Sequence, residues 1–126
     1  MTKTNKRMDK SKVYFTDLRA PVGTSQLTKL QRLIRSAGIG EIDMEKKLVA
    51  IKLHFGEPGN LTYLRPNYAK VVADVVNSLR WVPFLTDCNT LYPGRRKNAL
   101  EHMEAAYENG FSPFSTGCHV IIGDGL

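Results

Sequence analysis

The strongest indication of the fold class is the stretch LVAIKLHF, residues 48–55. Its apolar side chains alternate, with Val49, Ile51, Leu53 and Phe55 on one parity. Apolar residues at every second position are typical of a β-strand that turns one face to the core. We therefore predict a strand over residues 48–55, and the segments on both sides of it have the period of helices.

Three further β-rich runs and three helical segments extend this pattern along the chain. The further strands are predicted over residues 13–16, 84–86 and 119–122, and the helices over residues 26–37, 66–79 and 97–109. A capping oxygen from Thr24 or Ser25 and a stop at Gly38 frame the first helix, and Pro66 suits the first position of the second. The order β-α-β-α-β-α-β predicts an α/β fold of three layers with a mainly parallel sheet.

The composition is that of a globular protein rather than a disordered or membrane protein. The chain has 126 residues, of which 42% are hydrophobic and 24% are charged, and this length suits one compact domain. No stretch approaches the roughly 20 apolar residues of a membrane helix, and the polar start lacks the apolar core of a secretory signal. The two cysteines suit a reducing compartment. We therefore expect a cytoplasmic protein with no membrane partner.

The net charge of +6 is concentrated at the start of the chain. Residues 1–12 carry five lysines and arginines against one acid, so most of the excess lies there. We divide the chain into a disordered basic arm, residues 1–11, and an α/β domain, residues 12–126. The domain shows no basic face interleaved with aromatic platforms, and so we do not expect nucleic acid as a partner.

Polar residues follow each predicted strand. Asp17 follows the first strand, Lys52 and His54 close the second, and Asp87 and Asp124 follow the third and fourth. In an open parallel sheet, ligands bind along the edge formed by the carboxyl ends of the strands. An acid after a strand is also ordinary turn chemistry, and we assign Asp17 and Asp124 to turns. The loops after His54 and Asp87 are the candidate sites.

The first candidate loop, residues 52–60, combines a cation with two glycines. Lys52 and His54 share one face of their strand because side chains alternate. A lysine near the middle of a buried strand needs a partner, and Gly56 and Gly59 allow the backbone to turn closely around a ligand. We include Asn60 among the anion-binding residues. The alternative is that Lys52 reaches the rim of the sheet and His54 is a structural, hydrogen-bonded histidine.

The second candidate loop, residues 87–98, leads into the third predicted helix. Arg95 and Arg96 precede that helix and Lys97 opens it, although cations at this end oppose the helix dipole. Beside free backbone N–H groups, such cations would instead form an anion site, whereas the alternative is a solvated basic turn. The predicted anion-binding residues are Lys52, Asn60, Asn89, Thr90, Arg95 and Arg96. His54 and Asp87 are the candidates for proton transfer.

We predict no metal site in this chain. His54, Cys88, His102, Cys118 and His119 lack the spacing of metal ligands. His102 is expected within a helix and partly exposed. Cys88 is expected as a small buried residue, with a reactive thiol as the alternative. Cys118 and His119 open the last strand, at the end of the sheet away from the candidate loops, and are expected to be structural.

Two motifs resemble a known family. The runs LVAIKLHFGEPGN, residues 48–60, and FLTDCNTLYPGRR, residues 84–96, are similar to uncharacterised iron–sulfur-centre proteins that share the domain of unknown function 362. The resemblance covers about residues 12–126. It implies the amino-terminal portion of a larger α/β domain, and many members carry a ferredoxin-like segment further on. The family is distantly similar to the lactate racemase family, which suggests small-acid chemistry.

The chain departs from that family at two places. The cysteine run that holds iron–sulfur clusters is absent, so we predict no cofactor in this chain. We expect 4Fe-4S clusters only in a downstream ferredoxin-like segment of the full-length protein. In addition, Arg80, Trp81 and Val82 stand where a glycine-rich turn is expected before the third strand.

Two functions remain open from the sequence. The first is an enzyme fragment of an iron–sulfur-linked protein that binds a small anionic molecule. The second is a non-catalytic anion-binding or scaffold domain that serves a partner or cluster domain. The chain stops just past the fourth predicted strand, before any covering helix. We expect the rest of a larger domain to cover that sheet, and a homo-oligomer is the alternative.

Overall fold

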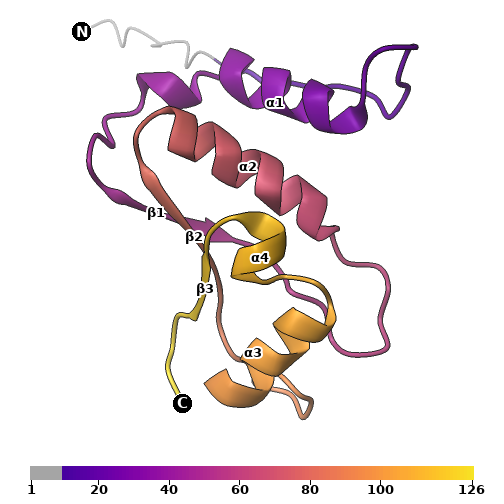
Figure 1. Ribbon diagram of the computed structural model, residues 1–126, viewed down its shortest axis with the longest axis vertical. Helices are drawn as coiled ribbons and strands as arrows, with labels where there is room; N and C mark the ends of the chain where they lie inside the picture. Colours follow the sequence, from indigo (N-terminus) through magenta and orange to yellow (C-terminus); the bar gives the residue numbers. More distant parts are fainter. Residues whose placement is uncertain (1–9) are drawn as a thin grey trace, which may run out of the picture.

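The computed structural model describes residues 10–126, which form an α/β fold (Figure 1). Helices alternate with strands along the chain, and the strands form a parallel sheet. The predicted fold class is therefore confirmed, while the basic arm falls mainly on residues 1–9, outside the described residues. The elements are α1 (Gln26–Ser36), η1 (Ile39–Glu41), β1 (Leu48–Lys52), α2 (Pro66–Ser78), β2 (Val82–Asp87), α3 (Ala99–Glu108), α4 (Pro113–Thr116) and β3 (His119–Ile122).

The sheet within residues 10–126 has three strands in the order β1-β2-β3, and all neighbours are parallel. Lys52 lies opposite Thr86 in the first pair, and Asp87 lies opposite Ile122 in the second. The carboxyl ends of the three strands therefore lie along one edge. This register brings the two candidate loops side by side, although 35 positions separate Lys52 from Asp87 in the sequence.

The predicted strand over residues 13–16 is wrong. These residues lie outside the sheet, and the side chains of Val13 and Phe15 are 89% and 83% exposed. A β-rich run becomes a strand only where a neighbouring strand accepts its backbone hydrogen bonds, and no described strand pairs with this one. Asp17, predicted in a turn after that strand, instead forms an ion pair with Lys29 of α1 at 2.5 Å.

Several element boundaries also differ from the prediction. β1 ends at Lys52 rather than at residue 55, because the chain leaves the sheet toward Gly56, whose φ is 86°. β2 is longer than predicted, and α3 begins only at Ala99 because Asn98 caps it. The short helix α4 and the 3-10 turn η1 were not predicted. The bounds of α1, α2 and β3 agree with the prediction to within one residue.

The core lies between one face of the sheet and the helices. Phe55, Leu85, Ala106, Phe111 and Val120 all belong to a single buried cluster that joins strands, loops and helices. α1 packs along α2 (Figure 1).

The opposite face of the sheet carries Leu48, Val82 and Ile121, which are 73%, 55% and 48% exposed. A second helix layer over that face, which a three-layer arrangement requires, is not seen within residues 10–126.

Arg80 occupies the turn before β2 with a left-handed backbone, φ 63°. This is the place where the resemblance to the iron–sulfur-centre proteins implies a glycine-rich turn. A side chain in this conformation costs about 1–2 kcal/mol, of which glycine recovers a part. We expect Arg80→Gly to raise the free energy of unfolding by about 0.5–1 kcal/mol, measured by urea denaturation. Arg80→Ala is the control, since alanine keeps the backbone penalty; a matching gain in Arg80→Ala would contradict this explanation.

Candidate functional site

The carboxyl ends of β1 and β2 join residues from both candidate loops. The Nζ of Lys52 donates a hydrogen bond to Oδ1 of Asp87 at 2.7 Å, and Asp87 also accepts from the backbone N–H of Cys88. Asp87 is buried, whereas the Lys52 side chain is 65% exposed at the rim of the sheet. This hydrogen bond raises the pKa of Lys52 above its ordinary value. Lys52 is therefore a fixed cation at the edge, with Asp87 as its partner.

Behind this pair, Arg96 is the centre of a buried charged network. The guanidinium is almost fully buried, and its Nε donates to Oε2 of Glu57 at 2.8 Å. Its Nη1 lies 3.6 Å from Oδ2 of Asp87, and its Nη2 donates to the hydroxyl of Tyr92. The bond from Arg96 is the main reason that the pKa of Glu57 lies below its ordinary value. Arg96 thus joins the two loops through protein carboxylates.

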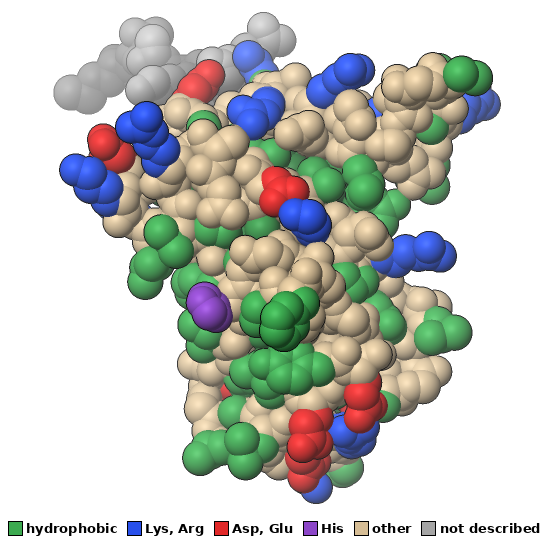
Figure 2. Space-filling model, in the orientation of Figure 1, with side chains coloured by type: hydrophobic (Ala, Val, Ile, Leu, Met, Phe, Trp, Pro, Cys, Tyr) green, Lys and Arg blue, Asp and Glu red, His purple; other side chains and the backbone are tan. Residues whose placement is uncertain are grey.

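Arg95 is also paired with carboxylates of the chain itself. Its Nη1 donates to Glu108 at 2.7 Å and its Nη2 to Glu104 at 3.3 Å, and Figure 2 shows acidic and basic side chains gathered over α3. Lys97 lies 3.6 Å from Glu101. The three cations before α3 therefore face acids rather than an open anion site. The geometry of this loop gives the anion hypothesis less support than the sequence suggested.

Asn89 and Thr90 form hydrogen bonds to other groups of the protein. The backbone N–H of Asn89 donates to the carboxylate of Asp124 at 2.9 Å, and its side-chain amide donates to the carbonyl oxygen of Gly125. The hydroxyl of Thr90 donates to the carbonyl oxygen of Tyr92. Asp124 lies in a turn, as predicted. Its bond to the loop after β2 was not predicted, because only the sheet order brings the two loops together.

The first loop forms an open cleft of about 420 Å³ beyond β1, which we call the β1 cleft. Its walls include Lys52, His54 and Asn60, which are three of the predicted site residues, together with Thr62 and Tyr63. Gly56 turns the chain here, and a Cβ at that position would collide with the ring of Tyr63. The structure therefore brings one cation and two polar side chains from a single loop into one cleft.

The hydrogen bonds inside the loop leave donors available at the β1 cleft. The backbone N–H of Gly56 donates to Nδ1 of His54 at 3.0 Å, so the neutral ring carries its proton on Nε2. Oδ1 of Asn60 accepts from both the N–H and the hydroxyl of Thr62, which leaves the amide N–H groups of Asn60 to donate elsewhere. Lys52 uses one of its three protons on Asp87. The polar groups of the cleft are thus mainly donors.

His102 is fully buried, and the expectation that it is partly exposed is wrong. It lies on the same face of α3 as Ala105 and Ala106, three and four residues on, which is the signal that could have shown its burial. Its Nδ1 lies 3.1 Å from Oδ1 of Asn89, while Nε2 has no hydrogen-bond partner among the described residues. Nε2 is 3.6 Å from Oδ2 of Asp87. His102 therefore lies next to the charged network.

The burial of His102 predicts a pH dependence of stability. Desolvation lowers the pKa of His102 below its ordinary value of 6.5, and this effect exceeds the opposing attraction of Asp87. Well above pH 6.5 both the folded and unfolded states are neutral at this site. As the pH falls below 6.5, the unfolded state takes up a proton first, so the free energy of unfolding decreases.

We expect urea unfolding of the chain to show this decrease between pH 7.5 and 5.5, with a slope of up to about 1.4 kcal/mol per pH unit. His102→Phe should remove the slope, and the exposed His119→Phe should retain it. An unchanged slope in His102→Phe would show that another group is responsible.

The two cysteines lie in different environments. Cys88 is exposed, so the expectation that it is a buried residue is wrong, because the chain has already left the sheet there. Cys118 is buried in the core, and burial raises the pKa of its thiol. The two thiols lie at opposite ends of the sheet. Among the described residues, no group of three or more histidines, cysteines or acids could hold a metal ion.

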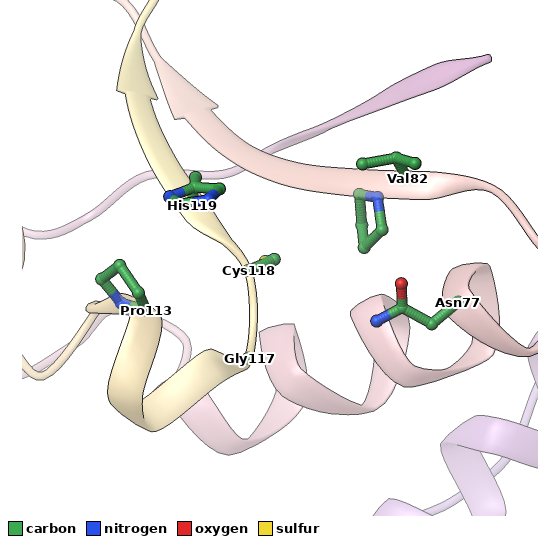
Figure 3. Close-up of a pocket in the computed structure, with 7 residues that line it drawn as sticks. Asn77, Val82, Pro113, Gly117, Cys118 and His119 are labelled. Carbon is green, nitrogen blue, oxygen red and sulfur yellow. The ribbon is translucent and has the colours of Figure 1, made fainter. Parts of the chain in front are cut away.

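A second cavity lies at the amino ends of the strands, far from the β1 cleft. It has about 210 Å³ and is bordered by Asn77 of α2, Val82 of β2 and Pro113 of α4, with Cys118 and His119 at the start of β3 (Figure 3). The buried, protonated thiol of Cys118 is part of the core. The predicted structural role of Cys118 is consistent with this position, and we place no chemistry in this cavity.

No helix within the described residues combines the length and the apolar character needed to cross a membrane.

Comparison with known families identifies one match. A family model described as Domain of unknown function (DUF362) matches residues 49–126, more than half of the chain. The match includes every residue of the charged network and of the β1 cleft. No curated protein and no solved structure matches the chain.

Proposed function

The chain belongs to the family of the domain of unknown function DUF362, and on this premise we propose that its β1 cleft binds a small carboxylate anion. The observation that carries the proposal is the donor set of the cleft. Lys52 supplies a positive charge, while His54 and Asn60 supply neutral N–H donors from the same loop. Charged hydrogen bonds to a carboxylate are about twice as strong as neutral ones.

The charged network supports this role by fixing Lys52. Asp87 holds the ammonium at 2.7 Å, and Arg96 in turn holds Asp87. Asp87 is buried and already engaged by cations, so we assign it as a positioning residue rather than as a free base. His54 is exposed at the cleft and is the group in it that could exchange a proton with a bound acid, through Nε2.

We extend the proposal to the protein that contains this domain. The resemblance to iron–sulfur-centre proteins suggests that any 4Fe-4S clusters are carried on another segment or chain, because the two cysteines here do not fit a cluster. Both thiols are free, which suits the reducing cytosol. An enzyme fragment and a non-catalytic scaffold would each use the same anion site. Binding is therefore the part of the proposal to test first.

Calorimetric titration of the chain with acetate and with phosphate tests the proposal. Three donors around one small anion suggest a dissociation constant on the order of 1 mM for acetate. We expect a single saturable site for acetate, and an unchanged affinity in Arg95→Met, because Arg95 is occupied by Glu104 and Glu108. The proposal fails if acetate gives no saturable binding, whether or not phosphate binds, or if Arg95→Met abolishes acetate binding.

A further inference from the structure

An apolar cavity adjoins the β1 cleft. It has about 280 Å³ and lies between Leu30 of α1, Ile51 of β1 and Val72 of α2. Tyr68 also borders it, but the tyrosine hydroxyl already donates to Oε1 of Gln26 at 2.8 Å. Apart from Lys52, the side chains around this cavity therefore present aliphatic or aromatic carbon.

The apolar cavity and the β1 cleft, which we together call the two hollows, share three lining residues. Lys52, Leu53 and Leu64 line both the apolar cavity and the β1 cleft. A ligand that places an anionic group beside Lys52 would therefore have an apolar space next to it. The proposed donors, His54 and Asn60, line the β1 cleft and not the apolar cavity. The site thus has a polar end and an apolar end, and Lys52 lines both.

We propose that the ligand of this site is an amphipathic monocarboxylate, with its carboxylate on Lys52, His54 and Asn60 and a short aliphatic chain in the apolar cavity. The inference rests on the proposed carboxylate site and adds the class of the ligand. Charge complementarity fixes the orientation of the ligand, since Lys52 lines both cavities while the donors His54 and Asn60 line only the β1 cleft.

The size of the apolar cavity limits the length of the chain. An apolar cavity of about 150 Å³ can hold a benzene molecule, so about 280 Å³ accommodates an aliphatic chain of similar carbon number. The cavity is slightly smaller than the usual range for ligand pockets, about 300–1,000 Å³. A short chain such as that of hexanoate fits this space, whereas a fatty acyl chain would extend beyond it.

Calorimetric titration with acetate, butanoate, hexanoate and 1-hexanol tests the inference. Each methylene that is fully buried should raise the affinity by up to about fourfold. We expect hexanoate to bind at least tenfold more tightly than acetate, and 1-hexanol to bind much more weakly than hexanoate. Equal affinities for acetate and hexanoate would overturn the amphipathic ligand and leave the carboxylate site standing. If 1-hexanol binds as tightly as hexanoate and acetate does not bind, the carboxylate site itself is wrong.

Variants locate the aliphatic chain of the ligand. Leu64 is 63% exposed, so Leu64→Ser should fold normally, and it should lower the hexanoate affinity at least threefold. Because Leu64 also lines the β1 cleft, the variant in which the acetate affinity should stay the same is Val72→Thr, since Val72 lines only the apolar cavity. Leu61→Ser is the matched control, because Leu61 lies in the same loop, is 85% exposed and lines neither hollow. Val72→Thr should act as Leu64→Ser does, and Val71→Thr should not. Hexanoate binding that neither Leu64→Ser nor Val72→Thr weakens would overturn the inference.

Discussion

Replacing Arg96 by methionine is expected to lower the free energy of unfolding by about 3–5 kcal/mol. Methionine matches much of the length of arginine but removes the charge. In wild type the guanidinium of Arg96 forms an ion pair with Glu57 and lies beside Asp87. In Arg96→Met both carboxylates would remain near the core without this cation. Breaking a buried ion pair on one side is costly because the remaining charge is left without compensation. The loss is large for a domain of this size.

The neighbouring arginine provides the control. Arg95→Met removes a cation whose partners, Glu104 and Glu108, are exposed to solvent, so the loss should be much smaller than for Arg96→Met. Urea denaturation at neutral pH measures both variants. Equal effects of the two substitutions would contradict the view that Arg96, and not the basic run as a whole, holds the two loops together.

Replacing Lys52 by methionine should have the largest effect on ligand binding. A hydrogen bond to a charged group contributes about 1.5–3 kcal/mol. We therefore expect the acetate affinity to fall by about 10- to 100-fold. The fold should tolerate this change, because the Lys52 side chain is 65% exposed and Asp87 keeps Arg96 as a neighbour.

Lys70→Met is the matched control for charge alone. Lys70 lies on α2 in an exposed pair with Asp74, and it lines neither the β1 cleft nor the apolar cavity. Its replacement lowers the net charge by the same amount and should leave acetate affinity unchanged. If the two lysine variants bind acetate equally well, a general electrostatic attraction, and not the cleft, accounts for any binding.

Local patterns predicted the elements that depend on local chemistry. The apolar period together with Ser25 and Pro66 placed α1 and α2, and alternation placed β3. Local patterns could not show whether residues 13–16 pair with another strand. Its β-branched and aromatic residues report a preference for a pleated surface, whereas pairing depends on a partner that the described sheet does not supply.

The sequence predicted three residues that line the β1 cleft, Lys52, His54 and Asn60, but not the partners of the predicted cations. The sequence required a partner for Lys52, and the parallel register supplies Asp87. The sequence analysis assigned Arg95 and Arg96 to anion binding. The neighbouring sequence does not show that Glu57 pairs with Arg96 or that acids of α3 pair with Arg95. Thr62 and Tyr63 were not predicted, since they reach the cleft only through the turn at Gly56.

The position of a bound carboxylate tests the central claim most directly. Acetate titration followed by backbone and side-chain amide NMR shifts should perturb Gly56, Thr62 and the side-chain amide of Asn60 together, with one affinity. The loop of residues 89–98 should change little, because its cations face protein carboxylates. Shifts confined to residues 89–98, with none at Asn60, would place the anion on the basic loop and contradict the account.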